Sequence, residues 1–380
     1  MKPPIKIIHL ITGLSTGGAE NTLAKLLAHK RMNGISSKVI SLKDDGPIGD
    51  EIRKLGIPVI NLGWRAGSVN LLQWLSLIKT LKKESPDILQ TWMYHADLVG
   101  GICGKLAGIK HILWNIRNLN LDKAYIKSST MWVVKVCAQL SKSLPKKIIV
   151  NSEHARTVHI KNGYDPSKFV IIPNGFDLSK FHPDKEAKAS VLKELNLPAD
   201  NELVGLVARY DPIKDHVNFL NAARILHKQN LKVHFLLCGR DITWENKDLV
   251  KFIEKNDLLH YTHLLGERKD IPRLTAALEI AVSSSAGESF SNTIGEAMSC
   301  GVPCVVTDVG DSANLVSNTG KVVPPNNHKA LAEGIMEILT MSLKDRRNLG
   351  LSARQRIHDK FELSCTLQKY KNLYLEITSQ

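Results

Sequence analysis

No hydrophobic run in this sequence approaches the length of about 18 residues that a membrane-spanning helix needs. Its six cysteines form no Cys-x-x-Cys pair, so we interpret them as small buried residues in a reducing compartment. Aromatic residues make up only 6% of the chain, and helix-turn-helix, zinc-finger and aromatic RNA-binding signatures are lacking, which argues against a nucleic-acid-binding protein. The absence of an Asp-x-Asp motif and of His or carboxylate groups with metal-ligand spacing predicts that no metal is needed.

The first residues also lack a secretory signal. The apolar stretch that begins at Ile5 is interrupted by His9, a glycine pair and Glu20, and no small-residue cleavage pattern follows. A buried first strand explains this stretch better than a signal peptide does. We therefore expect a cytoplasmic protein.

Acidic residues are scarce in the first half of the chain. The formal net charge is +14, and residues 1–180 hold 26 Lys and Arg against 12 Asp and Glu, whereas residues 181–380 hold 25 of each. The whole excess of positive charge therefore lies in the first half. Such a half attracts a polyanion, which leaves nucleic acid, a phospholipid surface and a phosphorylated substrate as candidates.

Short β-like runs alternate with helical stretches, which is the pattern of parallel sheets with helices on both faces. The length of 380 residues predicts two domains, separated by a turn-rich passage from Pro173 to Pro183. The fold class is therefore α/β, with two doubly wound sheets that bind ligands at the carboxyl ends of their strands. Strands are expected at Ile5–Ile11, Ser37–Leu42, Ile88–Thr91, Glu202–Ala208, Val233–Cys238 and Ile280–Ser283, and helices at Ala19–Met32, Leu71–Glu84, Thr293–Cys300 and Asp345–Thr378.

Two glutamates flank a loop in the second half of the chain. An apolar strand ends near Ser283, a small polar loop carries Glu288, and a helix starts near Asn292 or Thr293. The free N–H groups and the positive dipole at such a helix start suit a diphosphate. Glu296, in or near the first helical turn, is placed to bind a ribose diol, and Glu288 to meet a sugar. Each glutamate alone would also fit a helix-start acid or a solvated loop acid.

Two cations follow the strand expected at Glu202–Ala208. Arg209 and Lys214 lie just past its carboxyl end, so their side chains are aimed at the ligand-binding edge of the sheet. Fixed positive charges there can neutralise a diphosphate leaving group as it gains charge. Two surface cations in a loop are the plainer alternative.

The first half offers a second set of candidates. Gly17 and Gly18 follow the first strand and precede a helix, so the backbone can approach a ligand closely there, although a tight turn alone would also explain them. Their spacing is not Gly-x-Gly-x-x-Gly, which argues against a dinucleotide enzyme. His95 follows the fourth strand and is placed to hydrogen-bond a ligand, with Asn115 or Arg117, past the next strand, as alternatives. A lone histidine is more often structural.

These segments together resemble a known enzyme family. The run from Glu288 to Glu296, continued as Glu-Ala-Met-x-x-Gly-x-Pro to Pro303, resembles the donor-site signature of the retaining glycosyltransferases of family 4. The family usually has glycine where Ala208 and Asp215 stand, which is a departure from its pattern. Four further segments match in the right order and extend the resemblance over nearly the whole chain: Thr12–Glu20, Ile172–Asp177, Val207–Lys214 and Asp308–Asp311.

The resemblance implies a GT-B fold, in which two Rossmann-like domains face each other across a cleft. It implies an acceptor-binding domain at residues 1–176, a nucleotide-sugar-binding domain at 177–360, and a C-terminal helix at 361–380 that crosses back to the first domain. It further implies transfer of a hexose or N-acetylhexosamine from a nucleotide sugar to a lipid-linked, lipopolysaccharide or polysaccharide acceptor. A UDP-sugar is favoured as the donor and a GDP-sugar is the alternative, with no other cofactor.

By the same resemblance, the catalytic residues are expected to be Glu288, Arg209, Lys214 and His95. The expected donor-binding residues are Gly17, Gly18, Arg209, Lys214, Phe290, Ser291, Asn292, Thr293 and Glu296. A non-catalytic GT-B protein that only binds nucleotide sugar is the alternative from another class. It would be expected to have lost Glu288, Arg209 or Lys214, and all three are present.

Two basic stretches in the first half mix lysines with tryptophan and aliphatic residues. They span Trp64–Lys83, which includes Arg65, and Lys123–Lys147. An interfacial helix on anionic lipid needs this combination. A helix with one apolar face in the core and one basic face in water would show the same pattern. The resemblance favours the membrane interpretation, because many relatives use this domain to reach lipid-linked acceptors. We therefore expect peripheral attachment of the first domain to the inner face of the cytoplasmic membrane.

Overall fold

A computed structural model of the 380-residue chain describes most of its residues. Thr16 in the first glycine-rich segment, Arg65 in the first basic stretch and Lys123 at the start of the second lie outside the described residues. The described residues are 3–15, 17–29, 32–64, 70–118, 121, 126–229 and 232–379.

The chain folds into two compact units. Unit 1 comprises Met1–Asn174 together with Ser364–Gln380, and unit 2 comprises Gly175–Leu363. Both ends of the chain therefore belong to unit 1, and unit 2 is a continuous segment between them. The last helix of the chain is thus part of the same unit as the first strand.

Unit 1 is built on one parallel sheet with the strand order β3-β2-β1-β4-β5-β6-β7. The central strands are buried on both faces, which explains why they form continuous apolar runs instead of alternating patterns. The strands are β1 (Ile5–Ile11), β2 (Ile35–Ser41), β3 (Val59–Asn61), β4 (Ile88–Trp92), β5 (His111–Ile116), β6 (Lys147–Val150) and β7 (Phe169–Ile171).

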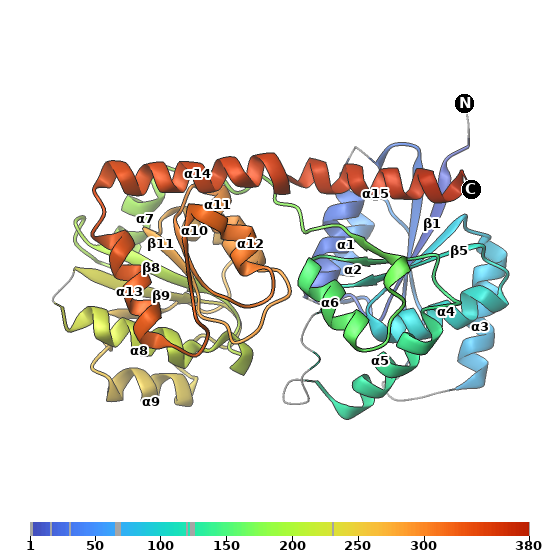
Figure 1. Ribbon diagram of the computed structural model, residues 1–380, viewed down its shortest axis with the longest axis horizontal. Helices are drawn as coiled ribbons and strands as arrows, with labels where there is room; N and C mark the ends of the chain where they lie inside the picture. The colour runs from blue at the N-terminus through green and yellow to red at the C-terminus, as the bar shows by residue number, and fades with distance from the viewer. Residues whose placement is uncertain are drawn as a thin grey trace. The chain divides into compact units, whose positions relative to one another are not determined.

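Helices cover both faces of this sheet (Figure 1). They are α1 (Gly18–Ala28), α2 (Gly46–Lys54), α3 (Leu71–Glu84), α4 (Tyr94–Leu106), α5 (Ser128–Leu140), α6 (Glu153–Lys161), the short 3₁₀ turn at Pro166–Lys168, and α15 (Leu363–Thr378). Neighbouring residues of β4 point to opposite faces: Leu89 packs in the core with α3, α4 and α5, whereas Gln90 accepts a 2.6 Å hydrogen bond from Tyr374 of α15.

Unit 2 contains a second parallel sheet with the order β10-β9-β8-β11-β12-β13. Its strands are β8 (Glu202–Val207), β9 (Val233–Cys238), β10 (Thr262–Leu264), β11 (Ile280–Ser283), β12 (Cys304–Thr307) and β13 (Lys321–Val323). Its helices are α7 (Ala187–Glu194), η3 (Pro212–Lys214), α8 (His216–His227), α9 (Lys247–Lys255), α10 (Ile271–Ala276), α11 (Asn292–Ser299), α12 (Ser312–Val316), η4 (Ser317–Thr319), α13 (His328–Leu339) and α14 (Leu343–Phe361).

The predicted α/β class with two doubly wound parallel sheets is confirmed. The strands predicted at Ile5–Ile11, Val233–Cys238 and Ile280–Ser283 have those bounds in the structure. The single C-terminal helix predicted for Asp345–Thr378 is wrong, because Glu362 has extended backbone angles (φ −59°, ψ 139°) and separates α14 from α15. The backbone of residue 176 makes hydrogen bonds on either side of this break, to Phe361 O and from Leu363 N, both 2.9 Å long.

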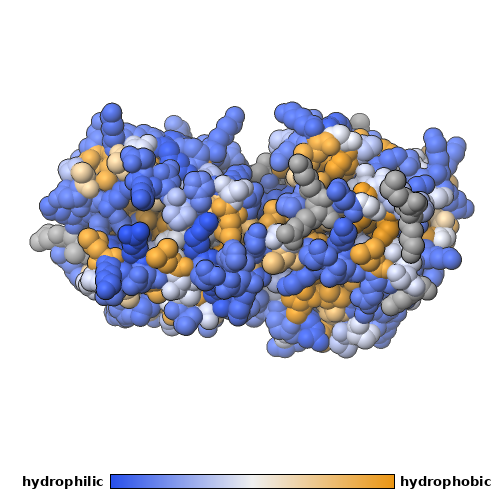
Figure 2. Space-filling view, turned by 90° about the horizontal axis from the view of Figure 1, so that it is seen from above, coloured by the Kyte–Doolittle hydropathy of each residue, from blue (hydrophilic) through white to orange (hydrophobic). Residues whose placement is uncertain are grey.

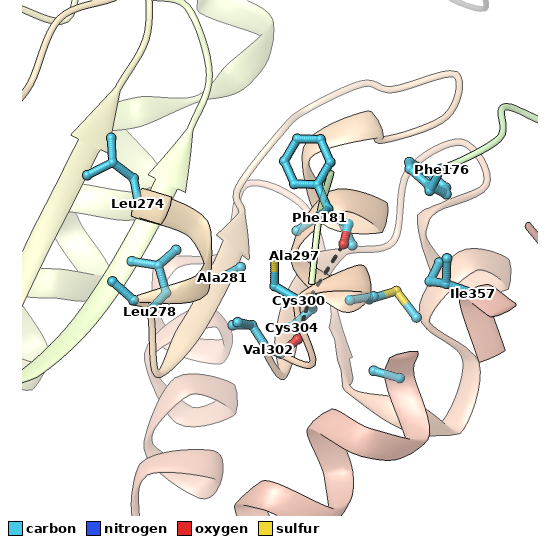
Figure 3. Packing of buried hydrophobic residues seen from close by; sticks show 14 of the residues in the cluster. Phe176, Phe181, Leu274, Leu278, Ala281, Ala297, Cys300, Val302, Cys304 and Ile357 are labelled. Atoms are coloured by element: carbon cyan, nitrogen blue, oxygen red, sulfur yellow. Dashed lines mark hydrogen bonds between the residues drawn. The ribbon is translucent and has the colours of Figure 1, made fainter. Parts of the chain in front are cut away.

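The core of unit 2 brings α11 against the segment that opens the unit. Phe176 is fully buried and stacks on Phe290 with ring centroids 6.1 Å apart. A Cβ atom at Gly295 of α11 would lie 1.9 Å from Cζ of Phe176, so the helix can approach the ring only because this residue is glycine. Figure 3 shows Phe176 on the same side of α11 as Ile357 of α14, within one hydrophobic cluster.

Helix α14 bonds to the carboxyl ends of two shorter helices. Arg354 donates to the carbonyl of Ser299, the last residue of α11. Arg356 donates from Nε to the carbonyl of Leu315 in α12 at 2.8 Å. The last carbonyls of a helix have no partner within it, and they carry the negative end of its dipole, so arginine is well suited to them. These contacts fix the directions of α11 and α12.

In unit 1, α15 is attached to the sheet by a polar cluster around Arg117. The guanidinium donates from Nε to Asn115 Oδ1 at 2.9 Å and from Nη1 to Asn174 Oδ1 at 2.5 Å. It also donates to the hydroxyl of Tyr370 and lies 5.9 Å from the centre of that ring. The end of β5, the end of the first segment of unit 1 and α15 therefore meet at one side chain.

We expect Gly295→Ala to lower the thermal unfolding midpoint of the protein. The new methyl group would overlap Phe176, and overpacking of this kind costs about 1–3 kcal/mol, which corresponds to several degrees for a unit of this size. Calorimetry measures the change. Gly18→Ala is the matched control, since a Cβ at Gly18 would meet no atom within 4 Å. Equal midpoints for the two variants would contradict this account of α11.

Candidate active site

Two of the expected cations lie at the carboxyl end of β8. Arg209 follows the strand by two residues, and Lys214 ends the 3₁₀ turn η3. Asp211 caps that turn, because its Oδ1 accepts a 3.1 Å hydrogen bond from the backbone N–H of Ile213, and Pro212 begins the turn as proline often does. Local capping therefore sets the path of the chain between the two cations.

Each of these cations is paired with a carboxylate. Arg209 donates from Nε and Nη2 to Oδ2 of Asp211 at 3.0 and 2.7 Å. Lys214 forms an ion pair with Glu288, whose side chain is only 13% exposed. Desolvation alone would raise the pKa of Asp211, but the hydrogen bonds from Arg209 and from the Ile213 N–H outweigh it and hold the pKa below its ordinary value.

Glu288 comes from the loop after β11, the strand next to β8 in the sheet. It is positioned by Ser285, whose Oγ donates to the carboxylate at 3.1 Å. Ser284 donates to the backbone carbonyls of Lys214 and Asp215 at 2.9 and 3.0 Å. The parallel order β8-β11 thus brings the two loops together, and Ser284 hydrogen-bonds the loop after β11 to the loop after β8.

The loop after β12 closes around the same glutamate. Gly310 has φ 57°, and a Cβ atom there would lie 1.8 Å from the carbonyl oxygen of Glu288. Only glycine fits this combination of backbone conformation and close approach. Thr307 at the end of β12 donates to the carbonyl of Ser285 at 2.6 Å. Three adjacent strands, β8, β11 and β12, therefore fix the position of Glu288.

The start of α11 lies next in the chain. Its N-cap Ser291 is buried and makes no side-chain capping hydrogen bond. Asn292 and Thr293 begin the helix and are half-buried, whereas the ring of Phe290 lies in the core, so Phe290 offers a ligand only its backbone. Glu296 is the fifth residue of the helix and half-buried, and helical side chains point back toward the N-terminus.

The other expected site residues belong to unit 1. Gly17 is the N-cap of α1 and Gly18 its first residue, at the carboxyl end of β1. His95 is the second residue of α4, which follows the neighbouring strand β4, and its ring is exposed. Desolvation by surrounding protein and the charge of Lys43 lower the pKa of His95. The glycines and His95 therefore lie at the carboxyl edge of the first sheet.

The turn that presents His95 has an unusual backbone. Met93 has φ 71° and ψ 159°, a conformation that costs a non-glycine residue energy and is often found at functional sites. It is stabilised by a 3.0 Å hydrogen bond from its N–H to the carbonyl of Asn115. Arg117, the alternative candidate from the next strand, uses its guanidinium in the cluster that attaches α15.

Sequence reasoning missed the side chains that position the charged residues. Asp211, Ser284 and Ser285 are polar loop residues and Thr307 ends β12, and none was predicted to position Arg209, Lys214 or Glu288. An Asp-Pro pair directly after a strand is a capping signal that could have indicated Asp211. Ser284 and Thr307 carry no such local signal, because their partners follow or belong to other strands.

Two searches of the described ranges gave negative results. Among those residues, no group of three or more His, Cys, Asp or Glu side chains has an arrangement that could hold a metal ion. No helix within the same ranges is both long and apolar enough to cross a membrane.

Relatives of known activity resemble the chain over most of its length. A galactosyltransferase of Escherichia coli, UDP-Gal:alpha-D-GlcNAc-diphosphoundecaprenol alpha-1,3-galactosyltransferase, is 26% identical over 348 residues, which cover 88% of each chain. The N,N'-diacetylbacillosaminyl-diphospho-undecaprenol alpha-1,3-N-acetylgalactosaminyltransferase of Campylobacter jejuni is 26% identical over 377 residues, covering 95% of this chain and 97% of the relative.

A solved structure shows the fold of the chain, and two family models show its family. The crystal structure of HepE from Anabaena in complex with UDP and glucose has a TM-score of 0.85 and 23% identity, covering 98% of this chain and 100% of HepE. Residues 16–180 match the model of Glycosyltransferase Family 4, and residues 188–356 match that of Glycosyl transferases group 1. The chain therefore belongs to glycosyltransferase family 4 and is a glycosyltransferase with the GT-B fold.

Proposed function

We propose that this enzyme transfers a hexose or N-acetylhexosamine from a UDP-sugar, with retention of configuration, to a lipid-linked, lipopolysaccharide or polysaccharide-type glycan. The observation that carries the proposal is the cluster of Arg209, Lys214 and Glu288 at the carboxyl edge of the second sheet. The names of the relatives support it, since the Escherichia coli enzyme uses UDP-Gal and both act on diphosphoundecaprenol-linked sugars to form alpha linkages.

In this proposal unit 2 binds the donor. The diphosphate lies against Arg209 and Lys214 and receives hydrogen bonds from backbone N–H groups at the start of α11, around Asn292 and Thr293. Glu296 binds the ribose diol of the nucleoside. The positive charges matter most as the bond between the sugar and the diphosphate breaks, because the leaving group then gains negative charge.

Retention follows from attack on the same face of the sugar that the leaving group occupies. A hydroxyl oxygen of the acceptor bonds to the anomeric carbon as the bond from that carbon to the diphosphate oxygen breaks. The hydroxyl proton passes to the departing diphosphate, so the products are the glycosylated acceptor and a nucleoside diphosphate. Glu288 then serves to bind the sugar and stabilise charge, and no covalent sugar–enzyme intermediate is needed.

Unit 1 binds the acceptor in this proposal. Gly17 and Gly18 let the backbone at the start of α1 approach the acceptor closely, and His95 hydrogen-bonds an acceptor hydroxyl. The lowered pKa of His95 supports this role, since a neutral imidazole can accept a hydrogen bond as well as donate one. The second candidate donor is a GDP-sugar, and no metal is required.

The surface of unit 1 supports attachment to an anionic membrane. Near the start of α3, Leu71 and Leu72 are 73% exposed and Leu75 is 51% exposed, whereas Leu77 and Leu81 further along the helix are fully buried. The exposed lysines of this helix follow toward its end, at Lys79, Lys82 and Lys83. An exposed apolar turn beside basic residues is what a helix resting on anionic lipid needs.

A further exposed aromatic residue lies on α5, where Trp132 is 62% exposed near Lys135. Hydrophobic residues also form separate patches on the face of the molecule shown in Figure 2. Together with the excess of basic residues in residues 1–180, the exposed apolar residues of α3 and α5 support a protein that works at the cytoplasmic face of the membrane through unit 1.

A thermal-shift screen against UDP, GDP and ADP tests the donor assignment. A nucleotide that binds the native protein raises its stability, by about 2.7 kcal/mol at a concentration of 100 Kd. We expect UDP to give the largest shift, and EDTA to leave that shift unchanged. A larger shift with GDP would favour the alternative donor, and a shift with ADP alone would contradict the proposal.

Substitution of the site residues should separate binding from turnover. Lys214→Ala is expected to lower turnover more than donor affinity, because its charge acts mainly on the leaving group. Glu296→Ala is expected to weaken donor binding, because it removes the partner of the ribose diol. Steady-state kinetics and calorimetric donor binding measure both effects. Unchanged kinetics in both variants would overturn the site assignment.

Co-sedimentation with vesicles tests the membrane surface. We expect the protein to sediment with phosphatidylglycerol-containing vesicles and not with pure phosphatidylcholine, and Leu71→Glu with Leu72→Glu to abolish the difference. Leu343→Glu is the matched control, since this leucine is 77% exposed but lies on α14 of unit 2. No preference for anionic vesicles in the unmodified protein would count decisively against attachment.

A further inference from the structure

Each of the two cations at the carboxyl edge of β8 faces a carboxylate before any ligand arrives. Arg209 faces Asp211 and Lys214 faces Glu288, so two positive charges are matched by two negative ones. Lys214 and Glu288 are largely buried, with side chains 21% and 13% exposed, whereas Arg209 is 51% exposed. A diphosphate that binds here therefore meets cations whose positions are already set by carboxylates.

Asp211 helps to set the positions of both cations. Its Oδ2 accepts the two hydrogen bonds from Arg209, at 3.0 and 2.7 Å. Its Oδ1 accepts the 3.1 Å hydrogen bond from the N–H of Ile213, the second residue of the turn that ends at Lys214. One carboxylate thus orients one cation directly and fixes the backbone that carries the other.

The way in which Asp211 holds Arg209 leaves part of the guanidinium available. A guanidinium is planar and has five N–H donors, and Asp211 occupies the edge formed by Nε and Nη2. The edge formed by Nη1 and Nη2 can still donate two parallel hydrogen bonds to a phosphate group. Because Asp211 holds the first edge, the guanidinium plane cannot rotate, and the Nη1–Nη2 edge keeps a fixed direction.

We propose that Asp211 is a positioning residue of the donor site, which orients Arg209 toward the diphosphate and holds the turn that carries Lys214. This inference rests on the proposed function. The carboxylate also weakens the attraction of Arg209 for the donor before reaction, while the fixed orientation benefits the leaving group as its charge grows. Asp211 therefore favours the transition state over donor binding.

This role differs from that of an ordinary surface ion pair. An exposed pair of an arginine and a nearby aspartate contributes little to stability, because water and salt screen it. Loss of the Asp211 charge is therefore expected to change turnover without changing the unfolding midpoint. Asp200 and Lys232 form a comparable exposed pair next to the amino ends of β8 and β9, away from the carboxyl edge of the sheet.

Asp211→Asn is the informative substitution, since an amide oxygen can still accept the N–H of Ile213 but no longer carries the charge that holds Arg209. We expect UDP to bind this variant at least as tightly as the unmodified protein, measured by calorimetry. We expect turnover of the nucleotide sugar selected by thermal shift to fall about tenfold. Asp200→Asn is the control and should change neither quantity.

A double-mutant cycle decides whether Asp211 acts through Arg209. In an Arg209→Ala background, Asp211→Asn is expected to leave turnover within about twofold of that of Arg209→Ala alone, because the residue that Asp211 positions is absent. An equal loss of turnover in both backgrounds, a loss of UDP affinity in Asp211→Asn, or an equal effect of Asp200→Asn would overturn the inference.

The failures of the two proposals can be told apart. If Arg209→Ala leaves UDP binding and turnover unchanged, the donor site itself is misassigned and the role of Asp211 falls with it. If Arg209→Ala impairs them but Asp211→Asn has no effect on turnover, the donor site stands and only the positioning role is overturned.

Discussion

The second unit depends on the close packing of α11 against its neighbours. Gly295 allows the ring of Phe176 to touch the helix, and Gly301, just after it, lies against Gly350 of α14, where a Cβ atom would be 1.9 Å from the Gly301 carbonyl. Arg354 then bonds to the last carbonyl of the helix. Because α11 has only 8 residues, fixing its carboxyl half also fixes its N-terminus, beside the loop that carries Glu288.

The charge of the whole chain and the charges of the site have separate roles. In unit 2 the cations Arg209 and Lys214 each face a carboxylate, and residues 181–380 carry equal numbers of acidic and basic side chains. The excess of positive charge lies in residues 1–180. In the proposed function, unit 1, which binds the acceptor, is therefore the part that attracts anionic partners at long range. Diphosphate binding in the proposed site depends instead on short-range geometry. The direction in which Asp211 holds the Arg209 guanidinium matters there more than net charge does.

The sequence predicted the parts of the fold that local pattern determines. Buried parallel strands such as Val233–Cys238 are continuous apolar runs, and their bounds follow from composition. The break at Glu362 could not be predicted, because its partner Phe176 is distant in sequence and neither glycine nor proline marks it. Leu71 continues the apolar spacing of α3 yet is exposed, since periodicity does not show where the core ends. In the candidate site, the charged residues carry motif signals, but the hydrogen bonds from Arg209 to Asp211 arise only from loop geometry.

The discontinuous composition of unit 1 has a consequence for how the chain folds during synthesis. Gln90 and Asn115 are buried polar residues whose partners, Tyr374 and Tyr370, are made after unit 2. Until α15 emerges from the ribosome, Gln90 and Asn115 lack these partners and remain hydrated. Unit 2 is continuous and can complete its own core earlier. Unit 1 therefore begins synthesis before unit 2 but completes its core after it.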